Sequence, residues 1–186
     1  MLSVKNGPEL EPSSPANALY DPLGLAPLPV DNRKRFLKFF LSQEQQVLLP
    51  LSQVLEVMQI LPENILSVPN MSNCILGVCI WKGETLWLID LNVLVGYEAL
   101  YQQSRLLETA SVIIVQERGQ TLGLVVERVE DIDLFDEGQI HSGAGLCPPG
   151  LEPFVLGHFP HGGGTVLETT SIFSASELHT YRQMQR

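Results

Sequence analysis

The stretch GVCIWKGETLWLIDL, residues 77–91, decides the fold, because two short apolar runs meet there at a turn. The runs are CILGVCIW (74–81) and TLWLIDL (85–91), and the residues between them are Lys-Gly-Glu. The glycine of this turn can take the positive φ angle that a tight connection between antiparallel strands requires. The stretch therefore predicts a β-hairpin.

Each arm of this predicted hairpin carries a tryptophan. Trp87 alternates with Leu86 and Leu88 on the returning arm, which favours a place in the core. Trp81 adjoins the turn, where either core packing or contact with a partner protein fits its position. Tryptophan is enriched among the residues that dominate protein interfaces. Both interpretations of Trp81 stay open at this point.

Further short apolar runs lie on either side of this hairpin. SVIIVQERGQTLGLVVERV (111–129) predicts a second hairpin that turns at residues 118–120. FVLGHF (154–159) and TVLETTSIF (165–173) flank a turn that begins at His161 and predict a third hairpin. Nearer the N-terminus, FLKFFL (36–41) predicts a strand with Leu37, Phe39 and Leu41 on one face.

The segment LSQVLEVMQI, residues 51–60, fits two patterns. Its apolar residues recur at helical spacing, yet Val54, Glu56 and Met58 also alternate with their neighbours as in a strand. The preceding VLLPL run contains Pro50, which has no amide hydrogen to donate, so that strand ends there or lies at a sheet edge. The residues alone leave the choice between helix and strand open for 51–60.

Two minor helices complete the predicted elements. One begins near Asp90 and runs towards Gly96, and the other begins with Ser174 and Glu177 at capping-box spacing, followed by Leu178 and Tyr181. With six to ten short strands, the chain is predicted to be all-β with minor helices, arranged as one barrel or as paired barrels.

The first 32 residues differ from the rest of the chain. They contain six prolines and show neither helical nor strand periodicity, so residues 1–32 are predicted to be a flexible tail. A short docking segment around Leu23, Leu25 and Leu28 is the alternative. The folded domain is expected over residues 33–180, with 181–186 as the C-terminal end.

Composition and charge exclude several classes of protein. Hydrophobic residues make up 45% of the chain and charged residues 17%, as in a globular domain. The net charge of -10 argues against binding to nucleic acid or to an anionic membrane. No apolar run approaches the roughly 18 residues of a membrane span, and the first residues lack the pattern of a signal peptide. Three scattered cysteines favour a reducing cytoplasm.

Signatures of catalysis and of cofactor binding are missing from the sequence. No serine stands in a G-x-S-x-G elbow, and Gly162–Gly164 lacks the lysine that follows in a phosphate-binding loop. The histidines have no spacing that suggests a zinc site, and Cys74 and Cys79 are expected to be buried. The acidic run 127–137 predicts a solvated strand face, or a surface that steers a basic partner. We expect no catalytic residue, no metal and no cofactor.

Taken in order, these motifs resemble the CheW-like coupling proteins of bacterial chemotaxis. The resemblance rests on segments that run from FLKFFL and LLPLSQVLEV through SVPNMSNCILGV, KGETLWLIDL and LGLVVERVEDI to the final GHF and VLETTSIF. It covers about residues 35 to 175, which is nearly the whole chain beyond the tail.

The resemblance implies a fold and a function. It implies two five-stranded, SH3-like β-barrels that share a core, with residues 54–60 as a strand after a turn. It also implies a non-enzymatic adaptor that binds the regulatory domain of a CheA-like histidine kinase and the cytoplasmic tip of a methyl-accepting receptor. The alternative is a stand-alone ligand-binding β-barrel. We expect a cytoplasmic protein recruited to membrane-associated receptor arrays.

The resemblance also implies a partner-binding site. Val54 and Glu56 match interface positions of the family, and Lys82 matches an arginine, which adds Trp81 as its neighbour. Lysine keeps the positive charge of arginine but lacks the planar group that holds a carboxylate through two hydrogen bonds. Trp87 stands where proline is common. These departures suggest a divergent member, serving a phototaxis or type IV pilus pathway.

Overall fold

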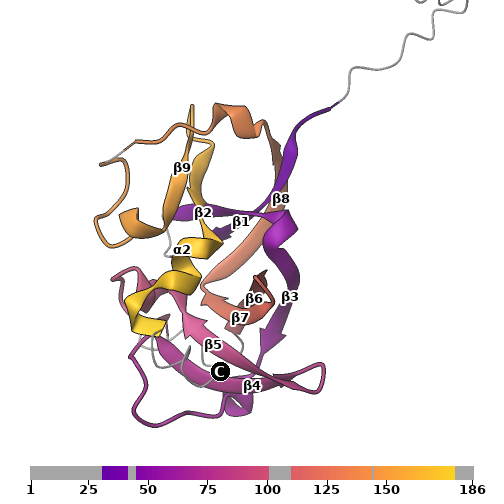
Figure 1. Ribbon diagram of the computed structural model, residues 1–186, viewed down its shortest axis with the longest axis vertical. Helices are drawn as coiled ribbons and strands as arrows, with labels where there is room; N and C mark the ends of the chain where they lie inside the picture. Colours follow the sequence, from indigo (N-terminus) through magenta and orange to yellow (C-terminus); the bar gives the residue numbers. More distant parts are fainter. Residues whose placement is uncertain (1–30, 42–44, 101–109, 144, 179–186) are drawn as a thin grey trace, which may run out of the picture. The chain divides into compact units, whose positions relative to one another are not determined.

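The computed structural model describes residues 31–41, 45–100, 110–143 and 145–178 (Figure 1). Nearly all of the predicted tail and the C-terminal end, 181–186, lie outside the described residues. The described residues form strands, which are β1 (Lys34–Phe40), β2 (Gln46–Pro50), β3 (Val54–Ile60), β4 (Ile75–Trp81), β5 (Glu84–Asp90), β6 (Ala110–Glu117), β7 (Gln120–Val126), β8 (Arg128–Phe135), β9 (Val155–Phe159) and β10 (Gly164–Leu167).

Two short α-helices and several 3-10 turns connect these strands. The α-helices are α1 (Leu91–Leu94) and α2 (Thr169–Ser174). The 3-10 turns are η1 (Leu51–Gln53), η2 (Pro62–Asn64), η4 (Glu137–Gln139), η5 (Glu152–Phe154) and η6 (Ser176–Leu178). None of the described helices has the length and apolar character that crossing a membrane needs.

The strands form two five-stranded sheets, which we call barrel 1 and barrel 2. Barrel 1 has the order β8-β1-β2-β10-β9, and barrel 2 has the order β3-β6-β7-β5-β4. Each contains one parallel pair, β2 with β10 and β5 with β7, among antiparallel neighbours. The chain thus leaves barrel 1 after β2, builds all of barrel 2, and returns to complete barrel 1. The predicted pair of five-stranded barrels is confirmed.

Alternation along the strands divides the apolar residues among three clusters. One cluster fills barrel 1 with Phe36, Leu48, Phe159 and Val166, and another fills barrel 2 with residues such as Leu86, Leu88, Val112 and Ile114. The third contains Leu37 and Phe39 from barrel 1 together with Trp87 and Ile89 from barrel 2. This cluster is the shared core that the family resemblance implies, and it confirms the buried position that the alternation around Trp87 predicts.

The predicted hairpins form around residues in the left-handed region. In the β4–β5 turn, Lys82 and Gly83 have φ angles of 51° and 85°. In the β6–β7 turn, Arg118 and Gly119 have φ angles of 49° and 82°. Two successive residues with positive φ are the signature of the hairpin turn whose twist matches that of the flanking strands. Glycine at the second position removes the steric penalty there.

The ambiguous segment 51–60 is a turn followed by a strand. Its first three residues form η1, and Val54–Ile60 form β3, which pairs antiparallel with β6. Burial alternates along β3 and confirms the strand interpretation. Pro50 ends β2, as its missing amide donor predicts.

The second predicted helix is wrong in position. Ser174 is the last residue of α2 and does not begin a helix, while Ser176–Leu178 form only a 3-10 turn. The third hairpin is correspondingly shorter, because β10 ends at Leu167 and the following residues belong to α2. Ile172 and Phe173 are buried in the shared core, and this packing favours a helix over a continued strand. Tyr181 lies outside the described residues.

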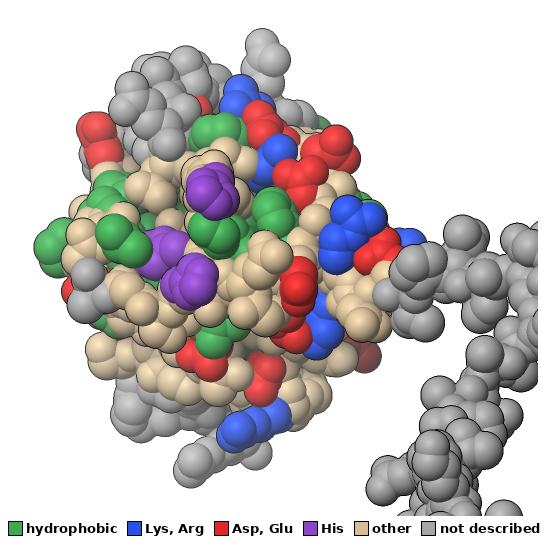
Figure 2. Space-filling view, turned by 90° about the horizontal axis from the view of Figure 1, so that it is seen from above, with side chains coloured by type: hydrophobic (Ala, Val, Ile, Leu, Met, Phe, Trp, Pro, Cys, Tyr) green, Lys and Arg blue, Asp and Glu red, His purple; other side chains and the backbone are tan. Residues whose placement is uncertain are grey.

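The acidic run around β8 forms the predicted solvated strand at one edge of barrel 1. Lys38 of β1 lies 2.9 Å from Asp133, and Arg128 lies 3.1 Å from Glu130. Figure 2 shows basic and acidic side chains intermixed on the side of the molecule where β1 and β8 lie. The acids of this run are therefore partly neutralised by neighbouring bases.

Candidate partner-binding site

Strand β3 and the β4–β5 hairpin carry all four predicted site residues, Val54 among them, and bring three of the four together. Glu56 lies in β3, Trp81 ends β4, and Lys82 occupies the turn. Strands β3 and β4 are the opposite edges of the barrel 2 sheet, so no ladder pairs them with each other within the described residues. The curvature of the barrel nevertheless brings the hairpin tip next to β3.

Glu56, Trp81 and Lys82 form one cluster, which we call the tip cluster. The indole Nε1 of Trp81 donates to Oε2 of Glu56 over 3.1 Å, and the ammonium of Lys82 lies 2.9 Å from the same oxygen. The Lys82 nitrogen also lies 4.4 Å from the centroid of the Trp81 ring. One carboxylate therefore holds both side chains of the hairpin tip in place.

The charge of Glu56 is stabilised by these contacts. The hydrogen bond from Lys82 and then that from Trp81 lower the pKa of Glu56 below its ordinary value of 4.5. The Lys82 side chain is 64% exposed and that of Glu56 39% exposed. Exposed ion pairs of this kind contribute little to stability, so the tip cluster serves mainly to fix an arrangement of surface groups.

The contacts of Trp81 fit both interpretations that the sequence left open. Its side chain packs against the cluster that fills barrel 2, yet it is only partly buried. Val54 stands apart from the tip cluster. It is half-buried, packs against the shared core, and is separated from Glu56 by a shift in the register of β3 against β6.

Sequence reasoning missed the exposed apolar residues on the strands that carry the tip cluster. Leu55 and Val57 on the outward face of β3 are 47% and 41% exposed, and Ile80 of β4 is 70% exposed. A cleft of about 520 Å³ lies between the two strands and is lined by Ile80 and by residues 58–61. The sequence did contain a sign of this exposure, because Leu55 and Val57 alternate with Glu56 and therefore occupy the opposite face of β3.

Groups that could hold a metal ion are not found in the part of the chain that the structure describes. Cys74 and Cys79 are buried, as predicted, and burial raises the pKa of both thiols. His158 is buried, and its Nδ1 lies 3.0 Å from the hydroxyl of Thr165. These residues belong to the packing of the two barrels.

Comparisons with known proteins agree with this architecture. The family model for the CheW-like domain matches residues 35–177. The crystal structure of the scaffolding protein TtCheW from Thermoanaerobacter tengcongensis is similar, with a TM-score of 0.60 and 23% sequence identity. That alignment covers 73% of this chain and 87% of the other. Curated protein sequences give no significant match. Because the family model spans most of the chain, this protein belongs to the CheW-like domain family.

Proposed function

We propose that this protein is a non-enzymatic adaptor that couples a CheA-like histidine kinase to methyl-accepting receptors. Membership of the CheW-like family supports the adaptor role. The observation that carries the proposal is the surface of β3 and β4, where exposed apolar side chains lie on the same two strands as the tip cluster. Exposed apolar groups that gather beside a polar rim are typical of protein interaction sites.

The kinase regulatory domain is the partner that we assign to this surface. Leu55, Val57 and Ile80 would supply apolar contact area, and the cleft beside Ile80 would receive an apolar side chain of the kinase. Glu56 and Lys82 already neutralise each other, so this contact would depend more on apolar burial than on net charge. Trp81 is held by Glu56 in one orientation, which lowers the entropy lost on binding.

The receptor tip is the second partner of the proposed adaptor. An adaptor must present separate surfaces to its two partners, and the two barrels offer such surfaces. Binding to receptors would place the protein in membrane-associated arrays without any insertion into the bilayer. A phototaxis or pilus pathway fits the departures from the family pattern at Lys82 and Trp87.

The alternative of a ligand-binding barrel has less support. The interior of barrel 1 is filled by the mutually packed rings of Phe36, Phe135 and Phe159, whose centroids lie 4.3–6.0 Å apart. The interior of barrel 2 is filled by fully buried aliphatic side chains such as Leu88 and Ile114. A small molecule would have to displace these residues from a close-packed core.

Calorimetric titration of the full chain with the kinase regulatory domain tests the proposal. We expect micromolar or tighter affinity, with Ile80→Asp and Lys82→Glu both weakening it. Lys34→Glu is the matched control, because Lys34 is also paired with a glutamate. Its side chain is 60% exposed, and that of Lys82 is 64% exposed. Absence of binding at about 100 μM, far above a micromolar dissociation constant, would reject the kinase as a partner.

A further inference from the structure

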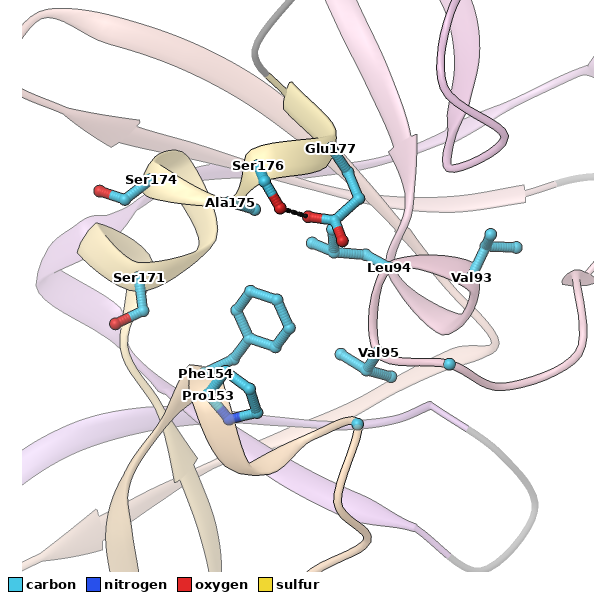
Figure 3. A pocket seen from close by; sticks show the side chains of 12 residues that line it. Val93, Leu94, Val95, Pro153, Phe154, Ser171, Ser174, Ala175, Ser176 and Glu177 are labelled. Carbon is cyan, nitrogen blue, oxygen red and sulfur yellow. Dashed lines mark hydrogen bonds between the residues drawn. The ribbon is translucent and has the colours of Figure 1, made fainter.

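A second cleft lies on the molecule at the junction of the two barrels. It has a volume of about 650 Å³ and is formed by α1, which follows β5 of barrel 2, and by η5, α2 and η6, which flank β9 and β10 of barrel 1 (Figure 3). Its walls therefore come from both halves of the fold. None of the residues that line it belongs to the tip cluster or to the cleft beside Ile80.

Close backbone contact fixes the shape of this junction cleft. A Cβ atom added to Gly150 would lie 2.1 Å from the carbonyl oxygen of Val95, and Gly96 has a φ angle of 83°. Only glycine at 150 allows the loop before η5 to lie directly against the end of α1. The cleft is thus preformed by backbone packing and does not depend on the rotation of a surface side chain.

The floor and the rim of the junction cleft differ in chemistry. Leu94, Val95, Phe154 and Ala175 form an apolar floor that continues into the shared core. Figure 3 shows the Phe154 ring standing between η5 and the α2–η6 segment, with Leu94 and Val95 across from it. The polar lining is confined to serine hydroxyls of α2 and η6 and to the carboxylate of Glu177.

Glu177 gives the rim a negative charge without a basic neighbour in the lining. Its Oε2 accepts the hydroxyl of Ser176 over 3.0 Å, and the described residues that line the cleft include no lysine, arginine or histidine. A hydroxyl cannot neutralise a carboxylate, so a cation brought to this rim would gain a charge-assisted hydrogen bond. The charge of the rim therefore complements a basic side chain.

We propose that the junction cleft docks a short amphipathic segment of a partner protein that carries spaced apolar residues and a flanking lysine or arginine. The apolar residues pack on Phe154 and Val95, and the basic residue pairs with Glu177. A polar metabolite fits less well, because the floor offers no convergent charged or amide groups that would orient it. Grooves of this composition recognise peptides through a few apolar anchors.

Selection from a phage-displayed library of random peptides of about 12 residues tests this proposal on the immobilised full chain. Bound phages are counter-selected on the Glu177→Lys variant. We expect the enriched peptides to share spaced apolar residues with a lysine or arginine at one flank. Enrichment of peptides that lack a basic residue, or a failure to enrich any consensus, overturns the proposal.

The consensus peptide is then mapped by heteronuclear NMR titration. We expect shifts in residues 93–96, 150–154 and 171–177, and a loss of affinity of about fivefold or more in Glu177→Lys. Glu63→Lys is the matched control, an exposed acid of η2 with the same charge change, and should alter affinity less than twofold. Equal losses in both variants would indicate attraction to the acidic protein as a whole and overturn the proposal. Much tighter binding after removal of residues 179–186 would also overturn it, because the chain itself would then be the occupant.

Discussion

The β4–β5 hairpin has two ends, and each is organised around one carboxylate that accepts two hydrogen bonds. At the tip, Glu56 accepts from the side chains of Trp81 and Lys82. At the base, Asp90 accepts from the backbone amides of Val93 and Leu100 over 3.2 and 3.0 Å. Asp90 is fully buried, whereas the tip cluster is open to solvent.

Burial determines what each carboxylate does. The contacts of Glu56 lower its pKa, but desolvation raises the pKa of Asp90 in spite of the backbone donors. Asp90 caps the start of α1 and satisfies amides that would otherwise be buried without a partner, so it is a structural residue. Glu56 orients groups at the surface, where a partner can replace its contacts. The same number of hydrogen bonds therefore supports the fold at one end and orients surface groups at the other, where we propose that a partner binds.

The two tryptophans give the largest expected difference between these regions. Trp87→Ala removes a side chain that is 8% exposed in the shared core and should lower the free energy of unfolding by about 3–5 kcal/mol. Trp81→Ala removes a partly exposed ring and one hydrogen bond, and should lower it by about 1–2 kcal/mol. Urea denaturation of both variants measures the difference. Equal losses would show that the hairpin tip is as much a part of the core as the arm.

The capping carboxylate gives the next largest effect. Asp90→Ala leaves the amides of Val93 and Leu100 without an acceptor, and should reduce the free energy of unfolding by about 2–3 kcal/mol. Asp90→Asn keeps one acceptor oxygen and should lose less. Thermal unfolding monitored by circular dichroism compares the two. A milder loss in the alanine variant than in the asparagine variant would contradict the assigned hydrogen bonds.

The backbone of this hairpin and the start of α1 were also the parts that sequence reasoning described best. The Lys-Gly turn, the helix start at Asp90 and the burial of Trp87 all follow from local signals, because a turn, a cap and an alternating strand each involve neighbouring residues. The interleaving of the two barrels is different. Pairing of β2 with β10 joins residues more than a hundred positions apart, and no local pattern specifies it without the family resemblance.

The tip cluster shows the same limit for the site. Glu56 and Trp81 are 25 positions apart and lie on strands that do not pair with each other, so their hydrogen bond is visible only once the barrel closes. The misplaced helix at Ser174 has a related cause. Its capping-box spacing was present, but burial of Ile172 and Phe173 placed the start of the helix at Thr169, before the predicted start at Ser174. Tertiary packing overrode a local signal there.

A charge swap separates the internal contacts of the tip cluster from its proposed role in binding. Glu56→Lys and Lys82→Glu each place like charges together, and each should reduce the free energy of unfolding only slightly, because exposed ion pairs contribute little. The double variant restores an ion pair and should recover that loss. We expect its affinity for the kinase regulatory domain to stay low, because the partner would still meet a reversed charge at position 82. Recovered affinity in calorimetric titration would show that Lys82 acts only through Glu56.

The smallest expected effect is on the pH dependence of stability, and it should have opposite signs at the two ends of the hairpin. The pKa of Glu56 is lowered by folding, so its contribution is present above the ordinary value of 4.5 and is lost as the pH falls through the folded pKa. The pKa of Asp90 is raised above 3.8, so the folded state binds the extra proton and gains stability as the pH falls through that raised value.

Melting curves of Glu56→Gln and Asp90→Asn against the parent chain, recorded from neutral to acidic pH, isolate the contribution of each carboxyl group to stability. The difference between parent and Glu56→Gln should shrink below pH 4.5, because the parent then loses the charge that the glutamine never had. The difference between parent and Asp90→Asn should instead grow in favour of the parent as Asp90 takes up its proton. Parallel curves for the glutamine variant at every pH would mean that Lys82 and Trp81 do not hold the Glu56 carboxylate in solution, and that the tip is free to rearrange before any partner arrives.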